Sequence, residues 1–265
     1  MKSSLLLSCL VLMCAAPPAA AQEPFPFQAQ VDALVQPYLE HREIGGLSIG
    51  VVHEGKSWTL HYGQLGEIPG ETPDDHTVYE VGSVSKVFTS LLLAKAVVDE
   101  QLTLDQTIGS LLPSLKEKNP RIANGVSLQH LSQHMSGLPR LPNNLRPADQ
   151  NNPYADYDRT AMMTFMETVF PDFKPGERYG YSNFGVGLLG ELLSTRAKSS
   201  YGELLQKVIL GPMAMQQSGL SLQPAPKRTF AKPYCSGLFP SHTWSFDVLA
   251  GCGAVQSTIG DMLLF

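Results

Sequence analysis

The chain has 265 residues, of which 43% are hydrophobic and 16% are charged, and its formal net charge is −5. This composition is typical of a globular protein of one large domain or two lobes, and it excludes a disordered chain, a collagen and a coiled coil. The acidic balance, without any basic run, argues against nucleic acid or an anionic membrane surface as a partner.

The first 21 residues have the layout of a secretory signal peptide. Lys2 provides a positive start, residues 5–15 form a short apolar run, and Ala19-Ala20-Ala21 offers small residues for cleavage. We therefore expect cleavage after Ala21, a mature chain that starts at Gln22, and a periplasmic or secreted location. A lipid anchor is the less favoured alternative.

Two of the four cysteines, Cys235 and Cys252, lie in the mature chain. Outside the cytoplasm the two can form a disulfide, provided that the fold brings them together. Two buried free thiols are the alternative, and the sequence leaves both open.

The mature chain begins with a predicted helix and a predicted β-hairpin. Residues 28–42 place apolar side chains at helical spacing. Residues 47–52 and 58–62 then read as two strands around a turn at Glu54-Gly55-Lys56. A third extended piece, residues 78–81, runs into Gly82.

The hydrophobic period changes at Ser83. Residues 87–98 are apolar on nearly every side, which predicts a central helix that is buried in the middle of the protein. Further helices are predicted in four ranges: 127–134, 159–169, 185–197 and 201–209. Residues 139–153 are rich in Pro and Asn and predict a surface loop that forms one wall of a cleft.

The end of the chain predicts one more short helix. Ser257 or Thr258 can cap it, and Asp261 is favourably placed in its first turn. Residues 262–265 are apolar and are followed by neither a C-cap nor a polar tail. From this we expect the sequence to be the N-terminal part of a longer protein.

Ser83 and Lys86 form the motif with the clearest chemistry, Gly82-Ser83-Val84-Ser85-Lys86. Three residues apart on a helix, their side chains lie on one face within reach of each other. A serine hydroxyl needs a neighbouring base to act as a nucleophile, and a desolvated lysine amine can serve. A helix N-cap followed by a solvated lysine is the alternative, but Lys86 directly precedes the apolar helix and is expected to be partly buried.

Tyr181 and Asn183 form a second polar group, the triplet Tyr181-Ser182-Asn183 after a turn at Pro175-Gly176. A tyrosine phenol near a lysine ammonium ionises more easily and can relay a proton to a leaving group. An asparagine amide can orient the lysine or hold a substrate carbonyl. The triplet is common, so it gains meaning only beside the first motif.

Together these segments resemble the class C β-lactamase and penicillin-binding-protein superfamily of serine hydrolases. The resemblance rests on four ordered segments: residues 82–86, residues 175–176 with 181–183, residues 128–139, and residues 253–258 with 261–262. It covers about residues 28–265. The Ser-Lys motif is widespread among β-lactamases and penicillin-binding proteins.

The resemblance implies a role for each of four residues. Ser83 would attack as the nucleophile, Lys86 would activate it, and Tyr181 would protonate the leaving group and later help a deacylating water. Asn183 would contact the substrate amide, and the N–H of Ser83 would be one oxyanion donor. The implied substrates are β-lactams or D-Ala-D-Ala cell-wall peptides, with small esters third, and no metal or organic cofactor is implied.

The resemblance also implies an α/β fold of the β-lactamase/transpeptidase type, an antiparallel sheet flanked by helices with an inserted all-helical lobe. Within a domain of residues 22–265, residues 22–99 would begin the α/β lobe, residues 100–245 would form the helical lobe, and residues 246–265 would start the return. The C-terminal strands of the sheet are expected to be missing. We expect a monomer, peripheral to the cell wall or membrane, whose substrate binds in the cleft between the lobes.

One element of the family has no match in the chain. It is a Lys- or His-Thr/Ser-Gly sequence on a later strand, which in the family binds the substrate carboxylate and supplies the second oxyanion donor. His242-Thr243-Trp244 lacks the glycine. This departure keeps two alternatives open: a binding or sensing protein that is acylated at Ser83 without turnover, and an inactive fragment.

Three other patterns have simpler explanations. Residues 185–190 match the dinucleotide fingerprint G-x-G-x-x-G, but no second strand follows, so tight helix packing explains them better. His130 and His134 are spaced as in a zinc helix but lack the glutamate and a third ligand, which favours a structural role. Tyr154 and Tyr157 are expected either to line the cleft or to anchor the loop.

Overall fold

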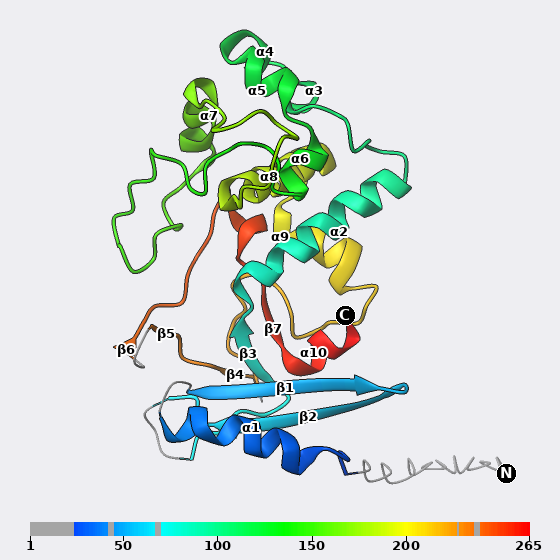
Figure 1. Ribbon diagram of the computed structural model, residues 1–265, viewed down its shortest axis with the longest axis vertical. Helices are drawn as coiled ribbons and strands as arrows, with labels where there is room; N and C mark the ends of the chain where they lie inside the picture. The colour runs from blue at the N-terminus through cyan, green and yellow to red at the C-terminus, as the bar shows by residue number, and fades with distance from the viewer. Residues whose placement is uncertain (1–23, 42–44, 67–69, 227, 236–238) are drawn as a thin grey trace, which may run out of the picture.

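A computed structural model describes residues 24–41, 45–66, 70–226, 228–235 (for Cys235 the backbone only) and 239–265. The predicted signal peptide, residues 1–21, lies outside the described residues. A helical part lies at one end of the molecule, and a β-hairpin with its covering helix lies at the other (Figure 1). Within the described ranges, no helix combines the length and the apolar character needed to cross a membrane.

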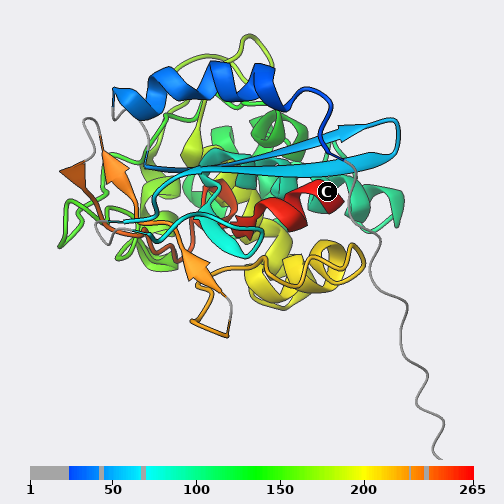
Figure 2. The same cartoon turned by 90° about the horizontal axis from the view of Figure 1, so that it is seen from below.

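The hairpin end consists of two strands between two helices. Its elements are α1 (Gln28–Glu40), β1 (Gly46–His53), β2 (Lys56–Gly63) and α10 (Ile259–Leu264). The strands pair antiparallel, and Glu54 and Gly55 take left-handed φ values of 49° and 75° at the turn, as a tight hairpin requires. Helices α1 and α10 lie on opposite sides of the hairpin (Figures 1 and 2). Both the predicted helix and the predicted hairpin are confirmed.

A small sheet connects this end to the helical part. Strand β3 (Thr77–Glu80) pairs in parallel with β4 (Thr229–Phe230) and antiparallel with β7 (Gln256–Thr258). Two further short strands, β5 (Tyr234–Cys235) and β6 (Phe239–Pro240), pair with each other. The chain leaves β7 through Thr258, whose hydroxyl accepts from the N–H of Asp261 and caps α10, as expected. The boundaries between the lobes stay a prediction.

The helical part is built around α8. Its elements are α2 (Ser85–Val98), α3 (Ile108–Leu111), α4 (Leu115–Lys118), α5 (Pro120–Gly125), α6 (Leu128–Ser132), α7 (Arg159–Thr168), α8 (Asn183–Ala197), α9 (Tyr201–Leu205), the π-helical turn η2 (Gln206–Leu210) and the 3₁₀ turn η4 (Ala250–Cys252). Helices α2, α6 and α9 and the turn η4 all contact α8. The four predicted helical ranges are confirmed, and the short helices α3, α4 and α5 were not predicted.

Helix α2 is less buried than its sequence predicts. Phe88, Leu92 and Leu93 are buried against α8, η4 and their neighbours, but Val87 is 51% exposed and Leu91 is 40% exposed. The expectation of burial on all sides is therefore wrong. Among the described residues, helices and turns cover α2 on one face only. An apolar composition alone does not predict whether one face of a helix or every face is covered by other segments.

The glycines of α8 serve close helix packing. A Cβ on Gly187 would meet Leu249 Cδ2 at 2.5 Å, and a Cβ on Gly190 would meet Gly251 Cα at 3.1 Å. The turn η4 thus lies directly on this face of α8. This confirms tight packing as the reason for the G-x-G-x-x-G pattern.

Cys252 lies in this turn as a buried free thiol. For Cys252 the alternative of a buried free thiol therefore holds, and not that of a disulfide. The side chain of Cys235 lies outside the part of the chain that the structure describes.

Candidate active site

Ser83 lies at the junction between the small sheet and the central helix. Strand β3 ends at Glu80, the 3₁₀ turn η1 (Gly82–Val84) carries Ser83, and α2 follows at once. Gly82 has a φ of 51°, a left-handed value that glycine adopts without strain and that lets the chain turn sharply into the helix. The serine is therefore exposed at the end of a rigid helix.

Lys86 is held one turn further along, and it is only 7% exposed. Its Nζ donates a hydrogen bond to Ser83 Oγ over 3.0 Å and another to the carbonyl oxygen of Cys252 over 2.6 Å. A buried amino group without partners would be costly, and these two oxygens each accept one of its N–H bonds. The predicted pairing of Ser83 with Lys86 is thus present, and the carbonyl of Cys252 is a third member that the sequence did not reveal.

A second set of bonds ties the Cys252 segment to α2 and β3. The N–H of Val255 donates to Ser85 Oγ over 3.0 Å, and the carbonyl of Val255 accepts from the N–H of Val81 over 3.0 Å. Both side chains, Ser85 and Val255, are fully buried. These bonds hold the backbone after Cys252 against α2 and β3, and they thereby set the position of the Cys252 carbonyl relative to Lys86.

Tyr181 approaches Ser83 from the start of α8. Its hydroxyl donates to Ser83 Oγ over 2.8 Å, and its ring centroid lies 5.0 Å from Lys86 Nζ. Burial acts to raise the pKa of the Tyr181 phenol, but hydrogen bonds with Lys86 and Ser83 and the charges of Lys86 and Arg140 outweigh it. The net effect lowers the pKa of Tyr181 below its usual value. Ser83, Lys86 and Tyr181 thus form one hydrogen-bonded cluster.

Asn183 lies beside this cluster rather than in it. Its Nδ2 donates to the hydroxyl of Tyr154 over 3.3 Å, while its buried Oδ1 has no hydrogen-bond partner among the described residues. Asn183 and Ser83 line the same small cavity of about 60 Å³, together with Tyr154 and the aromatic rings of Trp244 and Phe246. Tyr154 therefore faces the site, whereas Tyr157 anchors the loop by donating to Asn144.

Two further residues of the site were missed from the sequence as participants. His134 stacks on Tyr181 with ring centroids 4.4 Å apart, and its Nδ1 accepts from the N–H of Ser182. Burial, then the charge of Lys86, lowers the pKa of His134, so this ring favours its neutral form. The guanidinium carbon of Arg140 lies 5.0 Å from the Tyr181 ring centroid. Both residues fall in or directly after the segment of residues 128–139, which carries the family resemblance.

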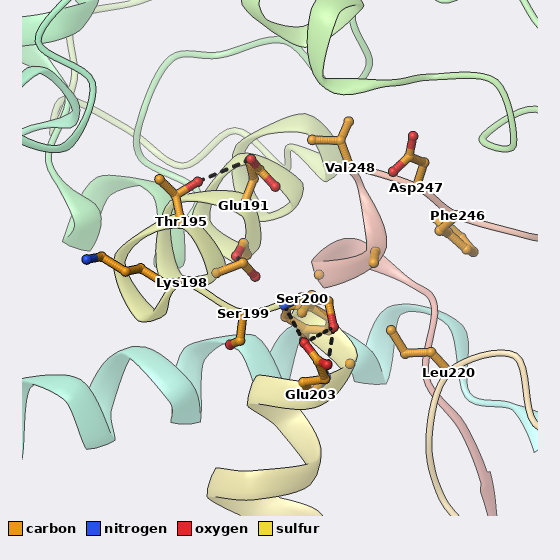
Figure 3. A pocket seen from close by; sticks show the side chains of 16 residues that line it. Glu191, Thr195, Lys198, Ser199, Ser200, Glu203, Leu220, Phe246, Asp247 and Val248 are labelled. Atoms are coloured by element: carbon orange, nitrogen blue, oxygen red, sulfur yellow. Dashed lines mark hydrogen bonds between the residues drawn. The ribbon is translucent and has the colours of Figure 1, made fainter.

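A larger cavity, of about 810 Å³, is lined mainly by residues of α8, α9 and η4. Figure 3 shows its polar lining, in which Glu191 contacts Thr195 and Glu203 contacts Ser200. Ser83, Lys86 and Tyr181 are not among its lining residues. Ser83 and Asn183 line the smaller cavity instead.

Comparisons with known proteins identify the family of the chain. The sequence profile of the Beta-lactamase family matches residues 31–265. A beta-lactamase of Providencia stuartii is 27% identical over 208 residues, which are 78% of this chain and 50% of that protein. The chain thus spans half the length of this relative.

Solved structures match over a larger share of the chain. A class C beta-lactamase in complex with cefoxitin superimposes with a TM-score of 0.77 and 29% identity, covering 90% of this chain and 64% of that one. The D-alanine carboxypeptidase AmpC from Burkholderia cenocepacia has a TM-score of 0.75 and 23% identity, covering 90% and 62%, and shows likeness of fold alone. The chain therefore belongs to the β-lactamase family and has the mixed α/β fold, with its helical lobe, of the class C β-lactamases.

Proposed function

We propose that this protein is a serine hydrolase that forms an acyl-enzyme on Ser83 and acts on β-lactams or D-Ala-D-Ala peptides. One observation carries the proposal. Two proton-transferring side chains, Lys86 and Tyr181, lie within hydrogen-bond distance of the same serine oxygen, at 3.0 and 2.8 Å. An activated nucleophile needs such a base within reach, and its leaving group needs an acid nearby.

In acylation, Ser83 Oγ forms a bond to the carbonyl carbon of the substrate while its proton passes to the neutral amine of Lys86. The carbonyl oxygen becomes an oxyanion, which the N–H of Ser83 stabilises at the start of the helix. Tyr181 then delivers its proton to the leaving nitrogen as the C–N bond breaks. The acyl-enzyme then holds Lys86 as an ammonium and Tyr181 as a phenolate, so that it forms with no net gain or loss of protons.

In deacylation, a water molecule replaces the amine. Tyr181 accepts one of its protons, the hydroxide attacks the ester carbonyl, and Ser83 Oγ leaves with a proton from Lys86. The lowered pKa of Tyr181 supports this second role, because a phenol that ionises more easily is more often in its basic phenolate form near neutral pH. Asn183 holds the acyl side of the substrate.

The choice of substrates is supported by the relatives. One matching structure contains the β-lactam cefoxitin, and another is described as a D-alanine carboxypeptidase. The signal-peptide pattern of residues 1–21 supports action in the periplasm or outside the cell, where cell-wall peptides and β-lactams are met.

Intact-mass spectrometry after incubation with benzylpenicillin tests the proposal. The expected result is a mass increase of one ligand, mapped to Ser83 and absent in Ser83→Ala. Decay of the adduct with release of product would indicate a hydrolase, whereas a stable adduct would indicate the sensing protein. A folded chain that gains no adduct at Ser83 would contradict the proposal.

A further inference from the structure

Arg140 is a cation of the site without a charged partner. Its guanidinium carbon lies 5.0 Å from the Tyr181 ring centroid, and Lys86 Nζ lies at the same distance from that centroid. The side chain is exposed, and none of the ion pairs formed between described residues includes it. An unpaired guanidinium beside a catalytic phenol is available to an anionic ligand.

The backbone of Arg140 is held in place by the start of α8. Its carbonyl oxygen accepts from the N–H groups of Asn183 and Phe184, over 3.0 and 3.2 Å. The preceding carbonyl, of Pro139, accepts from Ser182 Oγ over 2.7 Å. Residues 182–184, which directly follow Tyr181, thus bond to the backbone of Pro139 and Arg140. The backbone of Arg140 is therefore held at a fixed position relative to Tyr181.

The chemistry of the leaving group explains what this cation can bind. In a penicillin and in a D-Ala-D-Ala peptide, the nitrogen of the scissile bond carries a carbon that bears a carboxylate. Tyr181 is the residue placed to protonate that nitrogen. The carboxylate is only a few bonds away from the nitrogen and therefore lies close to the Tyr181 oxygen. A guanidinium stacked on the same tyrosine is within reach of it, and arginine binds carboxylates with two parallel hydrogen bonds.

We propose that Arg140 binds the carboxylate of the leaving group and thereby selects substrates whose scissile nitrogen carries such a carboxylate. The inference rests on the proposed function, since it takes Ser83 and Tyr181 as the reacting groups. It makes Arg140 a specificity-determining residue and disfavours esters of neutral alcohols as substrates.

The test compares two ligands that differ only in this charge, N-acetyl-D-alanyl-D-alanine and its C-terminal amide. Affinities are measured by NMR titration on the Ser83→Ala protein, in which turnover cannot occur. We expect the affinity for the acid to be at least about ten times the affinity for the amide. Adding Arg140→Gln should bring the ratio close to one and leave the affinity for the amide unchanged, whereas Arg140→Lys should keep part of the preference.

A matched control is available in Arg121, which also lies over an aromatic ring, that of Phe170, at 5.1 Å. Arg121 belongs to α5 and contacts Phe170 rather than Tyr181, so Arg121→Gln should leave the acid-to-amide ratio unchanged. The amide-region NMR spectrum of each variant checks that its fold is intact.

The inference would be overturned by any of three results. These are an equal affinity for acid and amide in the parent, a ratio that Arg140→Gln does not change, and no saturable binding of either ligand. The second result includes the case in which Arg140→Gln weakens the binding of acid and amide equally, because Arg140 would then act only by supporting Tyr181.

A separate measurement distinguishes failure of this inference from failure of the proposed function. The rate of acylation at Ser83 is compared for benzylpenicillin and its methyl ester in the otherwise native chain. A preference for the acid that Arg140→Gln removes would support the inference. Absence of an adduct with both compounds would contradict the proposed function, and the binding ratio would still decide on Arg140.

Discussion

The hydroxyl of Tyr181 donates a hydrogen bond to Ser83 Oγ over 2.8 Å, although the two residues are 98 positions apart in the chain. The serine belongs to the turn that opens α2, and the tyrosine directly precedes the capping residue of α8. Two helices of the core thus present their N-terminal ends to one another, and the reacting atoms meet there.

Replacing Lys86 by methionine should abolish most acylation. The substitution keeps the length of the side chain but removes the amine that bonds to Ser83 Oγ. Loss of a general base costs about 10²- to 10⁴-fold in rate, so we expect the acylation rate with benzylpenicillin to fall within or below that range. The rate is followed by intact-mass spectrometry.

Lys95 provides the control for this experiment. It lies on the same helix, and its ammonium pairs with Asp99 at the surface over 2.7 Å. Lys95→Met should leave the acylation rate unchanged. A Lys86→Met protein that acylates as fast as the native chain would show that another group takes the proton of Ser83.

Ionisation of Tyr181 should occur at an unusually low pH. Burial opposes ionisation, but the hydrogen bonds with Lys86 and Ser83 and the charges of Lys86 and Arg140 favour the phenolate and lower its pKa. By contrast, burial raises the pKa of Tyr201 and, with Asp32, that of Tyr62, each to about 12. Titration by ultraviolet difference absorbance should therefore show one tyrosine that ionises before the others.

Variants identify this tyrosine. Tyr181→Phe should remove the early transition. Lys86→Met should shift it to higher pH, because removal of a nearby positive charge destabilises the phenolate and raises the pKa. An early transition that persists in Tyr181→Phe would assign it to a different tyrosine.

Ser85→Ala should destabilise the protein without removing any catalytic group. The buried hydroxyl of Ser85 accepts from the buried N–H of Val255, and alanine would leave that donor without a partner. An unsatisfied buried donor costs about 1–3 kcal/mol, which a denaturant titration can resolve. Ser110→Ala, which removes an exposed hydroxyl bonded to the Thr107 carbonyl, should change the free energy of unfolding by less than about 0.5 kcal/mol. Equal effects of the two substitutions would argue against the bond from Val255 as a structural tie.

The two glycines Gly187 and Gly125 should respond in opposite directions to alanine. A Cβ on Gly187 would meet Leu249 Cδ2 at 2.5 Å and Leu249 Cα at 3.1 Å, whereas a Cβ on Gly125 meets nothing within 4 Å. Overpacking costs about 1–3 kcal/mol, while an unobstructed Gly→Ala change at Gly125, the last residue of α5, gains up to about 1 kcal/mol. Thermal unfolding should therefore show a lower midpoint for Gly187→Ala and an equal or higher one for Gly125→Ala. A neutral Gly187→Ala would mean that η4 is not pressed against α8.

Local features could be predicted from the sequence because they depend on neighbouring residues. The turn at Glu54-Gly55, the cap at Thr258 and the proximity of Ser83 to Lys86 each follow from a few adjacent positions. The short helices α3, α4 and α5 were missed, since four to six residues contain too few turns to show a helical period. The burial of α2 was overestimated for a different reason, because what covers a helix is decided by other segments.

The sequence by itself determined the nucleophile motif, the helix that carries it and the resemblance to a family. Only the tertiary structure decided which distant groups surround Ser83. The approach of Tyr181, the carbonyl of Cys252 beneath Lys86 and the guanidinium of Arg140 above the tyrosine all come from segments far apart in the chain. The physical reason is that periodicity and capping act over a few residues, whereas these contacts depend on how α2, α8 and η4 pack on one another.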